Sequence, residues 1–234
     1  TSEIGDAFYE HPIPDVISFT GSTNVGVRIG EVAGRNVKKT MLELGGNNAI
    51  VVLDDADVDY AVKACTFGRF FHSGQICMSA NRIIVDESIF AEFAEKYVAL
   101  VKTLKVGDPS LPDTLVGPLI TEDEAVRVVD WAEKARAEGA QILLEGKREN
   151  SVVYPYVIKG TNETWTAKNE VFGPVVTLIC AKDEADALRI ANDTDAGLSG
   201  AIHTSSKERG FQFAKHWKTG MVHINDQSVN DEPG

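Results

Sequence analysis

The sequence predicts an α/β protein in which a sheet of short strands is covered by helices on both faces. Short runs rich in Val and Ile alternate with amphipathic helical runs along almost the whole chain, a pattern typical of strand–helix–strand units. The chain has 234 residues, of which 43% are hydrophobic and 25% are charged. This is the balance of an ordinary globular protein whose core needs no disulfide or metal.

The predicted strands are short, rich in β-branched residues and bounded by turn residues. In chain order they are residues 16–20, 49–53, 82–85, 141–144, 152–158, 175–180, 201–204 and 221–224.

The predicted helices fill the segments between these strands. They cover residues 57–71, 88–104, 121–139, 183–192 and 205–219, with a further helical run that starts at residue 27. An acidic stretch at residues 54–57 supports a helix start at residue 57, since negative side chains stabilise a helix N-terminus. Thr121 and Glu124 have capping-box spacing, and Gly139 is placed to end the same helix.

The charge of the chain excludes several classes of partner. The 23 Lys and Arg residues against 35 Asp and Glu residues give a formal net charge of −12. Nucleic-acid binding, which needs a basic patch, and binding to anionic membranes are therefore not expected. No apolar run approaches the roughly 18 residues of a membrane-spanning helix. The first residues also lack the basic and apolar regions of a signal peptide, so a cytoplasmic protein is predicted.

The three cysteines differ in their sequence surroundings. Their odd number and wide spacing argue against a disulfide framework and for a reducing compartment, and no His or Cys set has the spacing of a metal site. Cys65 on an apolar helix face and Cys180 at the end of an apolar strand are predicted to lie in the core. Cys77 follows Gly74 in a predicted loop, so a nucleophile and a structural thiol are equally open.

A glycine-containing turn joins the first strand to the helical run that follows it. Residues 21–26 read Gly-Ser-Thr-Asn-Val-Gly, and a helix N-terminus at such a turn points backbone N–H groups at an anion. Gly26 is followed by Val27 and Arg28, so this is not a P-loop, and the G-x-G-x-x-G fingerprint is absent as well. A plain turn with a Ser/Thr helix cap is the other interpretation.

Two acidic residues occupy unusual positions. Glu43 lies between Leu42 and Leu44, just before two glycines. It is either a surface acid or a desolvated carboxylate, whose raised pKa would suit a general base. Glu170 lies in a turn before a strand, a position that indicates little when taken alone.

Four stretches, taken together and in order, are more specific than any one of them. They are residues 19–23 (Phe-Thr-Gly-Ser-Thr), 42–46 (Leu-Glu-Leu-Gly-Gly), 74–77 (Gly-Gln-Ile-Cys) and 170–174 (Glu-Val-Phe-Gly-Pro). This series resembles the NAD(P)-dependent aldehyde dehydrogenase superfamily over essentially the whole chain.

The resemblance implies a two-part organisation. Residues 1–42 are similar to the last strand and helix of a Rossmann-type cofactor domain. Residues 43–234 are similar to the aldehyde dehydrogenase-type catalytic domain, an α/β sheet covered by helices. The family's first half and its oligomerisation arm are expected to be absent, and residues 231–234 to lie in a continuing loop. The chain is thus expected to be a truncated piece of a homo-oligomeric parent.

The resemblance also implies catalytic roles. Cys77 would attack the aldehyde, forming a thiohemiacetal and then a thioester. The Cys77 N–H, with an Asn from the missing half, would hold the oxyanion. Glu43 would act as general base on the hydrolytic water, which favours release of a carboxylic acid over transfer to coenzyme A.

An NAD or NADP site, incomplete in this chain, is implied by the same resemblance. Its residues would be Gly21, Ser22 and Thr23 near the pyrophosphate, Leu44 beside the cofactor, Glu170 on the nicotinamide ribose hydroxyls and Phe172 packed nearby. Asn169 departs from relatives that place a second acid there, which should alter local charge more than chemistry. Because much of this site would be missing, a catalytically silent isolated domain is the alternative interpretation of the chain.

The substrate is predicted from the same comparison. The loop at residues 224–231, with Ile76 and Met78 beside the thiol, resembles members that oxidise aromatic aldehydes such as benzaldehyde or vanillin. The expected partner is therefore a small aldehyde.

Overall fold

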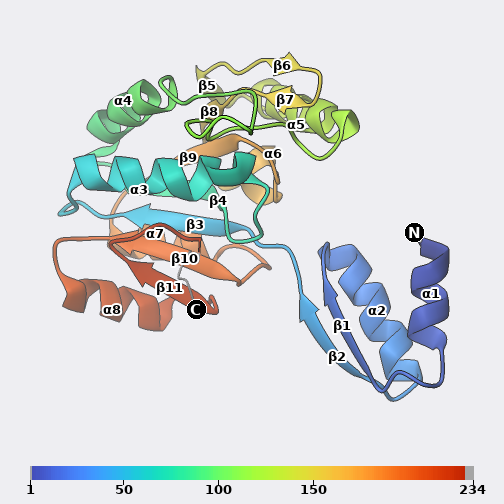
Figure 1. Ribbon diagram of the computed structural model, residues 1–234. Helices are drawn as coiled ribbons and strands as arrows, with labels where there is room; N and C mark the ends of the chain where they lie inside the picture. Colours follow the sequence, from blue (N-terminus) through green and yellow to red (C-terminus); the bar gives the residue numbers. More distant parts are fainter. Residues whose placement is uncertain (1, 230–234) are drawn as a thin grey trace. The chain divides into compact units, whose positions relative to one another are not determined.

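The computed structural model describes residues 2–229 and divides the chain into two compact units, residues 1–45 and 46–234 (Figure 1). The division falls after Gly45, a short distance beyond the boundary predicted after residue 42. Each unit has its own hydrophobic core. The continuing loop predicted at residues 231–234 lies outside the described residues.

The smaller unit is a strand–helix–strand motif preceded by a helix. Its elements are α1 (Ser2–Glu10), β1 (Val16–Thr20), α2 (Thr23–Arg35) and β2 (Lys39–Glu43). The two strands run parallel, with Thr20 opposite Glu43, and Ile17, Ile29 and Ala33 form the core between sheet and helix. No local pattern predicts β2, because this strand lacks alternation and is stabilised by pairing with β1.

The larger unit contains the remaining elements. They are β3 (Asn48–Val52), α3 (Val58–Phe70), the 3₁₀ turn η1 (Phe71–Gly74), β4 (Ala80–Asp86), α4 (Phe90–Val101), α5 (Glu122–Ala137), β5 (Gln141–Leu144), β6 (Arg148–Glu149), β7 (Val152–Val153), β8 (Tyr156–Gly160), α6 (Trp165–Lys168), β9 (Val175–Ala181), α7 (Glu184–Asn192), β10 (Ser199–His203), α8 (Lys207–His216) and β11 (Met221–Ile224).

A seven-stranded sheet organises this unit. Its strand order is β11-β10-β3-β4-β9-β8-β5, with every neighbouring pair parallel except β5 and β8. Side chains alternate between faces along β3, so Ile50 packs in the cluster with α3 and α4, whereas Val51 packs in the cluster with α7 and α8. The prediction of a sheet with helices on both faces is confirmed (Figure 1).

Local signals predicted several helix starts, but the helical run expected from residue 27 begins at Thr23, so residues 23–26 belong to α2 and not to the turn before it. The side chain of Asp57 accepts a hydrogen bond from the Tyr60 N–H, and Thr121 accepts one from the Glu124 N–H, as helix caps do. The predicted strand at 152–158 is wrong as a single element. It is divided into β7 and β8 around Pro155, which has no N–H for a sheet ladder.

The prediction that both non-loop cysteines are core residues is half correct. Cys65 of α3 is fully buried, and burial raises the pKa of its thiol. Cys180 is exposed, although it lies on the same face of β9 as the buried Val176 and Leu178. It lies one residue from the strand's carboxyl end, where the cover on that face has ended.

A buried histidine makes the stability of this unit sensitive to acid. His203 of β10 is 2% exposed, and burial lowers its pKa from 6.5 to about 4, against a smaller opposing effect of the Asp226 backbone. The unfolded chain binds a proton here below pH 6.5, whereas the folded chain does so only near pH 4. Stability from this residue is therefore complete above pH 6.5 and is lost as the pH falls toward 4.

We expect the His203→Phe variant to lose this acid sensitivity. Between pH 7 and pH 4, the wild-type chain should lose about 3 kcal/mol more unfolding free energy than the variant. Urea unfolding at several pH values measures this difference. His216→Gln, at an exposed histidine of α8, is the control and should follow the wild type. Parallel pH profiles for wild type and His203→Phe would contradict the prediction.

Within residues 2–229, no helix combines the length and apolar character needed to cross a membrane.

Candidate active site

The Cys77 loop is shaped by a left-handed turn. His72, Ser73 and Gly74 have φ values of 51°, 60° and 72°, so the chain turns sharply between α3 and β4. A Cβ atom on Gly74 would lie 2.6 Å from the Gly173 carbonyl oxygen, which makes glycine necessary there. Cys77 follows in a turn closed by the Ser79 N–H and the Ile76 carbonyl at 2.9 Å, and it is partly exposed at the amino end of β4.

Gly46 brings Cys77 and Glu170 together. Its N–H donates to Glu170 Oε1 at 3.1 Å, and a Cβ atom at this position would lie 2.5 Å from the Cys77 carbonyl oxygen. Only glycine fits between the two. Of the residues predicted from sequence, Cys77 and Glu170 thus share one site in the larger unit.

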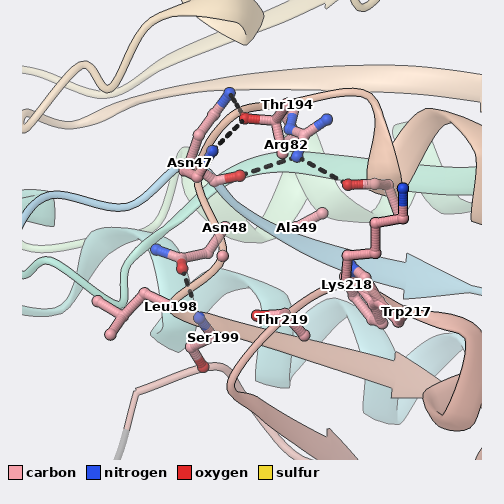
Figure 2. A pocket seen from close by; sticks show the side chains of 13 residues that line it. Asn47, Asn48, Ala49, Arg82, Thr194, Leu198, Ser199, Trp217, Lys218 and Thr219 are labelled. Atoms are coloured by element: carbon pink, nitrogen blue, oxygen red, sulfur yellow. Dashed lines mark hydrogen bonds between the residues drawn. The ribbon is translucent and has the colours of Figure 1, made fainter.

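Asn48 fixes the backbone of the cysteine loop. Its Nδ2 donates to the Cys77 carbonyl at 2.6 Å and to the Ser79 carbonyl at 3.2 Å. Its Oδ1 accepts from the Ser199 N–H at 3.0 Å (Figure 2). Because Asn48 is 3% exposed, these bonds are shielded from water and hold the loop between β3 and β10.

The segment after β11 lies against the residue next to Cys77. Ser228 Oγ donates to the Met78 carbonyl at 2.8 Å, and the Ser228 carbonyl accepts from Ser199 Oγ at 2.7 Å. Gln227, Ser228 and Val229 are all buried. The described part of the predicted substrate loop therefore borders the cysteine loop, whereas Asn230 and Asp231 lie outside the described residues.

The Glu170 carboxylate is partly buried, and its environment acts on its pKa in both directions. Burial raises the pKa, while the Gly46 N–H and the positive charges of Arg69 and Arg127 lower it; the net shift is upward. The turn after it contains Phe172, a non-glycine residue at φ 49° that is 41% exposed. Backbone strain of this kind persists only where the surrounding structure holds it.

Two buried arginines that belong to none of the predicted motifs support these loops. Arg69 donates to the carbonyls of Ala80 and Gly173, and burial lowers its pKa to about 10, so it remains charged at neutral pH. Arg82 donates to the Asn47 carbonyl at 2.8 Å (Figure 2) and to the Ile190 carbonyl at 2.9 Å. The available signal is the placement of polar pairs, Asn-Asn at 47–48 and Asn-Arg at 81–82, beside apolar strands.

The smaller unit gathers the other predicted residues at one end of its two strands. The Gly21 N–H donates to the Glu43 carbonyl at 3.0 Å, so the turn at 21–23 adjoins the end of β2. Ser22 is the N-cap residue of α2, but its side chain makes no capping bond. A Cβ on Gly26 would lie 2.4 Å from Leu44 Cδ2. The N-terminus of α2 thus meets the carboxyl end of a parallel sheet, a geometry typical of phosphate sites.

The observed position of Glu43 disagrees with one of the two interpretations made from the sequence, that of a desolvated carboxylate. Its side chain is exposed, so the prediction of a desolvated carboxylate is wrong for the smaller unit. The physical reason is strand alternation: Leu42 packs on the core with Ile29, and Glu43 therefore points to the opposite face.

Comparison with known proteins identifies the chain. The aldehyde dehydrogenase family model matches residues 1–234. The chain belongs to the aldehyde dehydrogenase family. It is 52% identical over 233 residues to a benzaldehyde dehydrogenase of Bacillus subtilis, covering 99% of this chain and 48% of that protein. It is 48% identical over 235 residues to a vanillin dehydrogenase of Corynebacterium glutamicum, covering 99% of this chain and 49% of that protein.

A solved aldehyde dehydrogenase structure matches the fold as well. The crystal structure of an NAD-dependent benzaldehyde dehydrogenase from Corynebacterium glutamicum superposes with a TM-score of 0.92 at 47% identity, covering 97% of this chain and 49% of that one. This aldehyde dehydrogenase chain therefore spans about half the length of the relatives it matches.

The residues present fit parts of a dinucleotide. The uncapped first turn of α2 offers backbone N–H groups to a phosphate, and the Glu170 carboxylate offers acceptors to hydroxyl groups. Among residues 2–229, no group of three His, Cys, Asp or Glu side chains is placed to hold a metal ion.

Proposed function

We propose that this chain is the catalytic half of an enzyme that oxidises an aldehyde to a carboxylic acid with NAD⁺ or NADP⁺. The observation that supports this most directly is the joint contact of Gly46 with the Cys77 backbone and the Glu170 carboxylate. This contact brings the partly exposed Cys77 and the Glu170 carboxylate, which can accept hydrogen bonds from ribose hydroxyls, to the same end of one sheet. Membership of the aldehyde dehydrogenase family gives this arrangement its reaction class.

Cys77 would carry the covalent chemistry. Its thiolate adds to the aldehyde carbon, giving a thiohemiacetal whose oxyanion accepts a hydrogen bond from the Cys77 N–H. Bound NAD⁺ or NADP⁺ supplies the hydride acceptor that oxidises this carbon. Water then attacks the resulting Cys77 thioester while Glu43 takes the water's proton, and the thiolate leaves as the carboxylic acid forms.

The remaining predicted residues would bind the cofactor. Gly21, Ser22 and Thr23 would meet the pyrophosphate with the backbone N–H groups of the α2 N-terminus. Leu44 would lie beside the cofactor, Glu170 would accept from the nicotinamide ribose hydroxyls, and Phe172 would pack nearby. Residues 1–45 form one two-stranded sheet and its helices, so we expect the 234 residues alone to bind cofactor poorly.

An aromatic aldehyde is the proposed substrate class. It is supported by the names of the benzaldehyde and vanillin dehydrogenases to which the chain is similar. The hydrogen bond from Ser228 to the Met78 carbonyl supports it as well, because residues 224–229 of the loop thereby border the residue next to Cys77. A cytoplasmic location and a homo-oligomeric parent remain predictions from the sequence.

The test is a substrate panel with the full-length protein that contains this chain. We expect benzaldehyde and vanillin to give kcat/KM values at least about tenfold above those of acetaldehyde and butanal, because an aromatic ring buries more apolar surface. The 234-residue chain alone, run in parallel, should give little NADH or NADPH. A preference for short aliphatic aldehydes would refute the proposed substrate class. Absence of any aldehyde oxidation would refute the proposed function.

A further inference from the structure

The turn that carries Glu170 is held by a buried asparagine at the start of β4. Asn81 is 1% exposed. Its Nδ2 donates to the Asn169 carbonyl at 2.9 Å, and its Oδ1 accepts from the Val171 N–H at 3.1 Å. A single carboxamide therefore bonds to the peptide groups on both sides of Glu170, so it restricts the direction in which the Glu170 side chain leaves the backbone.

A second asparagine supports the first. Asn81 Nδ2 also lies 2.9 Å from Asn47 Oδ1, and Asn47 in turn donates to the Ala167 carbonyl at 2.9 Å. Asn47 directly follows Gly46, whose N–H bonds to the Glu170 carboxylate. Gly46, Asn47, Asn81 and Glu170 thus form a closed network. It joins the amino ends of β3 and β4 to the turn before β9, and we call it the asparagine clamp.

The turn beyond Glu170 needs such support. Phe172 has φ 49°, in the left-handed region. Arg127 donates to the Val171 carbonyl at 2.8 Å, and Arg69 donates to the Gly173 carbonyl. Among the side chains of the described residues, Asn81 is the one that bonds directly on both sides of Glu170, and it lies on the strand that begins shortly after Cys77.

We propose that Asn81 is a positioning residue that orients the Glu170 carboxylate toward the cofactor and holds it at a fixed position relative to the Cys77 loop. This proposal rests on the proposed function, because it assigns Glu170 to the nicotinamide ribose. Asn81 touches neither substrate nor cofactor and acts through Glu170. Removal of the Asn81 carboxamide should therefore weaken cofactor binding specifically. This weakening should occur only when Glu170 is present.

The experiment is a double-mutant cycle in the full-length protein, with Asn81→Ser, Glu170→Gln and the pair together. We expect Asn81→Ser to raise KM for the cofactor roughly tenfold, since a buried clamp on a ribose-binding carboxylate is lost, while KM for the aldehyde changes little. In the Glu170→Gln background, Asn81→Ser should have almost no further effect on cofactor KM, because residues that act as one unit are non-additive.

Two controls separate positioning from general damage to the fold. Thr66→Val removes another buried hydrogen bond of this unit, the 2.7 Å bond from Thr66 Oγ1 to the Val62 carbonyl in α3, and should leave cofactor KM unchanged. Asn47→Ser removes the Oδ1 acceptor behind Asn81 and the bond to the Ala167 carbonyl, but leaves the two bonds from Asn81 to the turn in place. It should therefore raise cofactor KM by a smaller factor than Asn81→Ser. It also serves if Asn81→Ser fails to fold, which thermal unfolding would reveal.

The outcomes distinguish the positioning role of Asn81 from the assignment of Glu170 to the nicotinamide ribose, on which it rests. If Glu170→Gln leaves cofactor KM unchanged, the assignment of Glu170 to the ribose is wrong and the clamp proposal fails with it. If Glu170→Gln raises KM but Asn81→Ser and Asn47→Ser do not, or if their effects add fully to that of Glu170→Gln, only the positioning role of Asn81 is overturned.

Discussion

Replacement of Cys77 by serine is expected to abolish aldehyde oxidation in the full-length protein, with a fall in kcat on the order of 10⁴-fold or more. A serine hydroxyl is a much weaker nucleophile than a thiolate and cannot form the thioester. The fold should be unaffected, because Cys77 lies in a partly exposed turn and its carbonyl, which Asn48 holds, is unchanged by the substitution. Steady-state NADH formation and a thermal unfolding curve measure the two effects.

Cys180→Ser is the matched control for this experiment. Cys180 is exposed at the end of β9, and burial together with nearby acidic residues raises its pKa. The variant should keep full activity. In the wild-type chain, alkylation followed by peptide mass spectrometry should label Cys77 faster than Cys180 below pH 7, with the buried Cys65 slowest. Retained activity in Cys77→Ser would refute the catalytic assignment.

The Glu43→Gln variant is expected to lose turnover while keeping the first chemical half of the reaction. A general base contributes about 10²- to 10⁴-fold, and here it would act on the water that hydrolyses the thioester. The acyl-enzyme should then accumulate. Rapid mixing should show a burst of NADH close to one equivalent per site, followed by a slow steady state.

Glu31→Gln provides the comparison for this variant. Glu31 is an exposed glutamate of α2 in the same small unit, so it matches the charge change without touching the turn at residues 21–23. It should leave both burst and steady state intact. An unchanged steady-state rate in Glu43→Gln would show that another group activates the water. Loss of the burst itself would place Glu43 before the thioester step.

Local sequence signals predicted much of the fold because they act over a few residues. Asp57 and Thr121 cap helices that begin at the next residue, and the predicted strands at 16–20, 141–144 and 221–224 agree with β1, β5 and β11. Predictions failed where segments distant in the sequence determine the local structure or its exposure. β2 exists through its pairing with β1, and the exposure of Cys180 depends on how far the cover of its sheet face extends.

The sequence by itself determined the α/β class, the helix caps, the four ordered motifs and, through them, Cys77, Glu43 and Glu170 as candidates. Only the tertiary structure decided that Gly46 joins Cys77 to Glu170, and that Asn81 holds the peptides on both sides of Glu170. These hydrogen bonds link residues 124, 88 and 90 positions apart. A buried amide can satisfy its donors and acceptors with any segment that the fold brings near, so its partners follow from the assembled sheet and no local pattern specifies them.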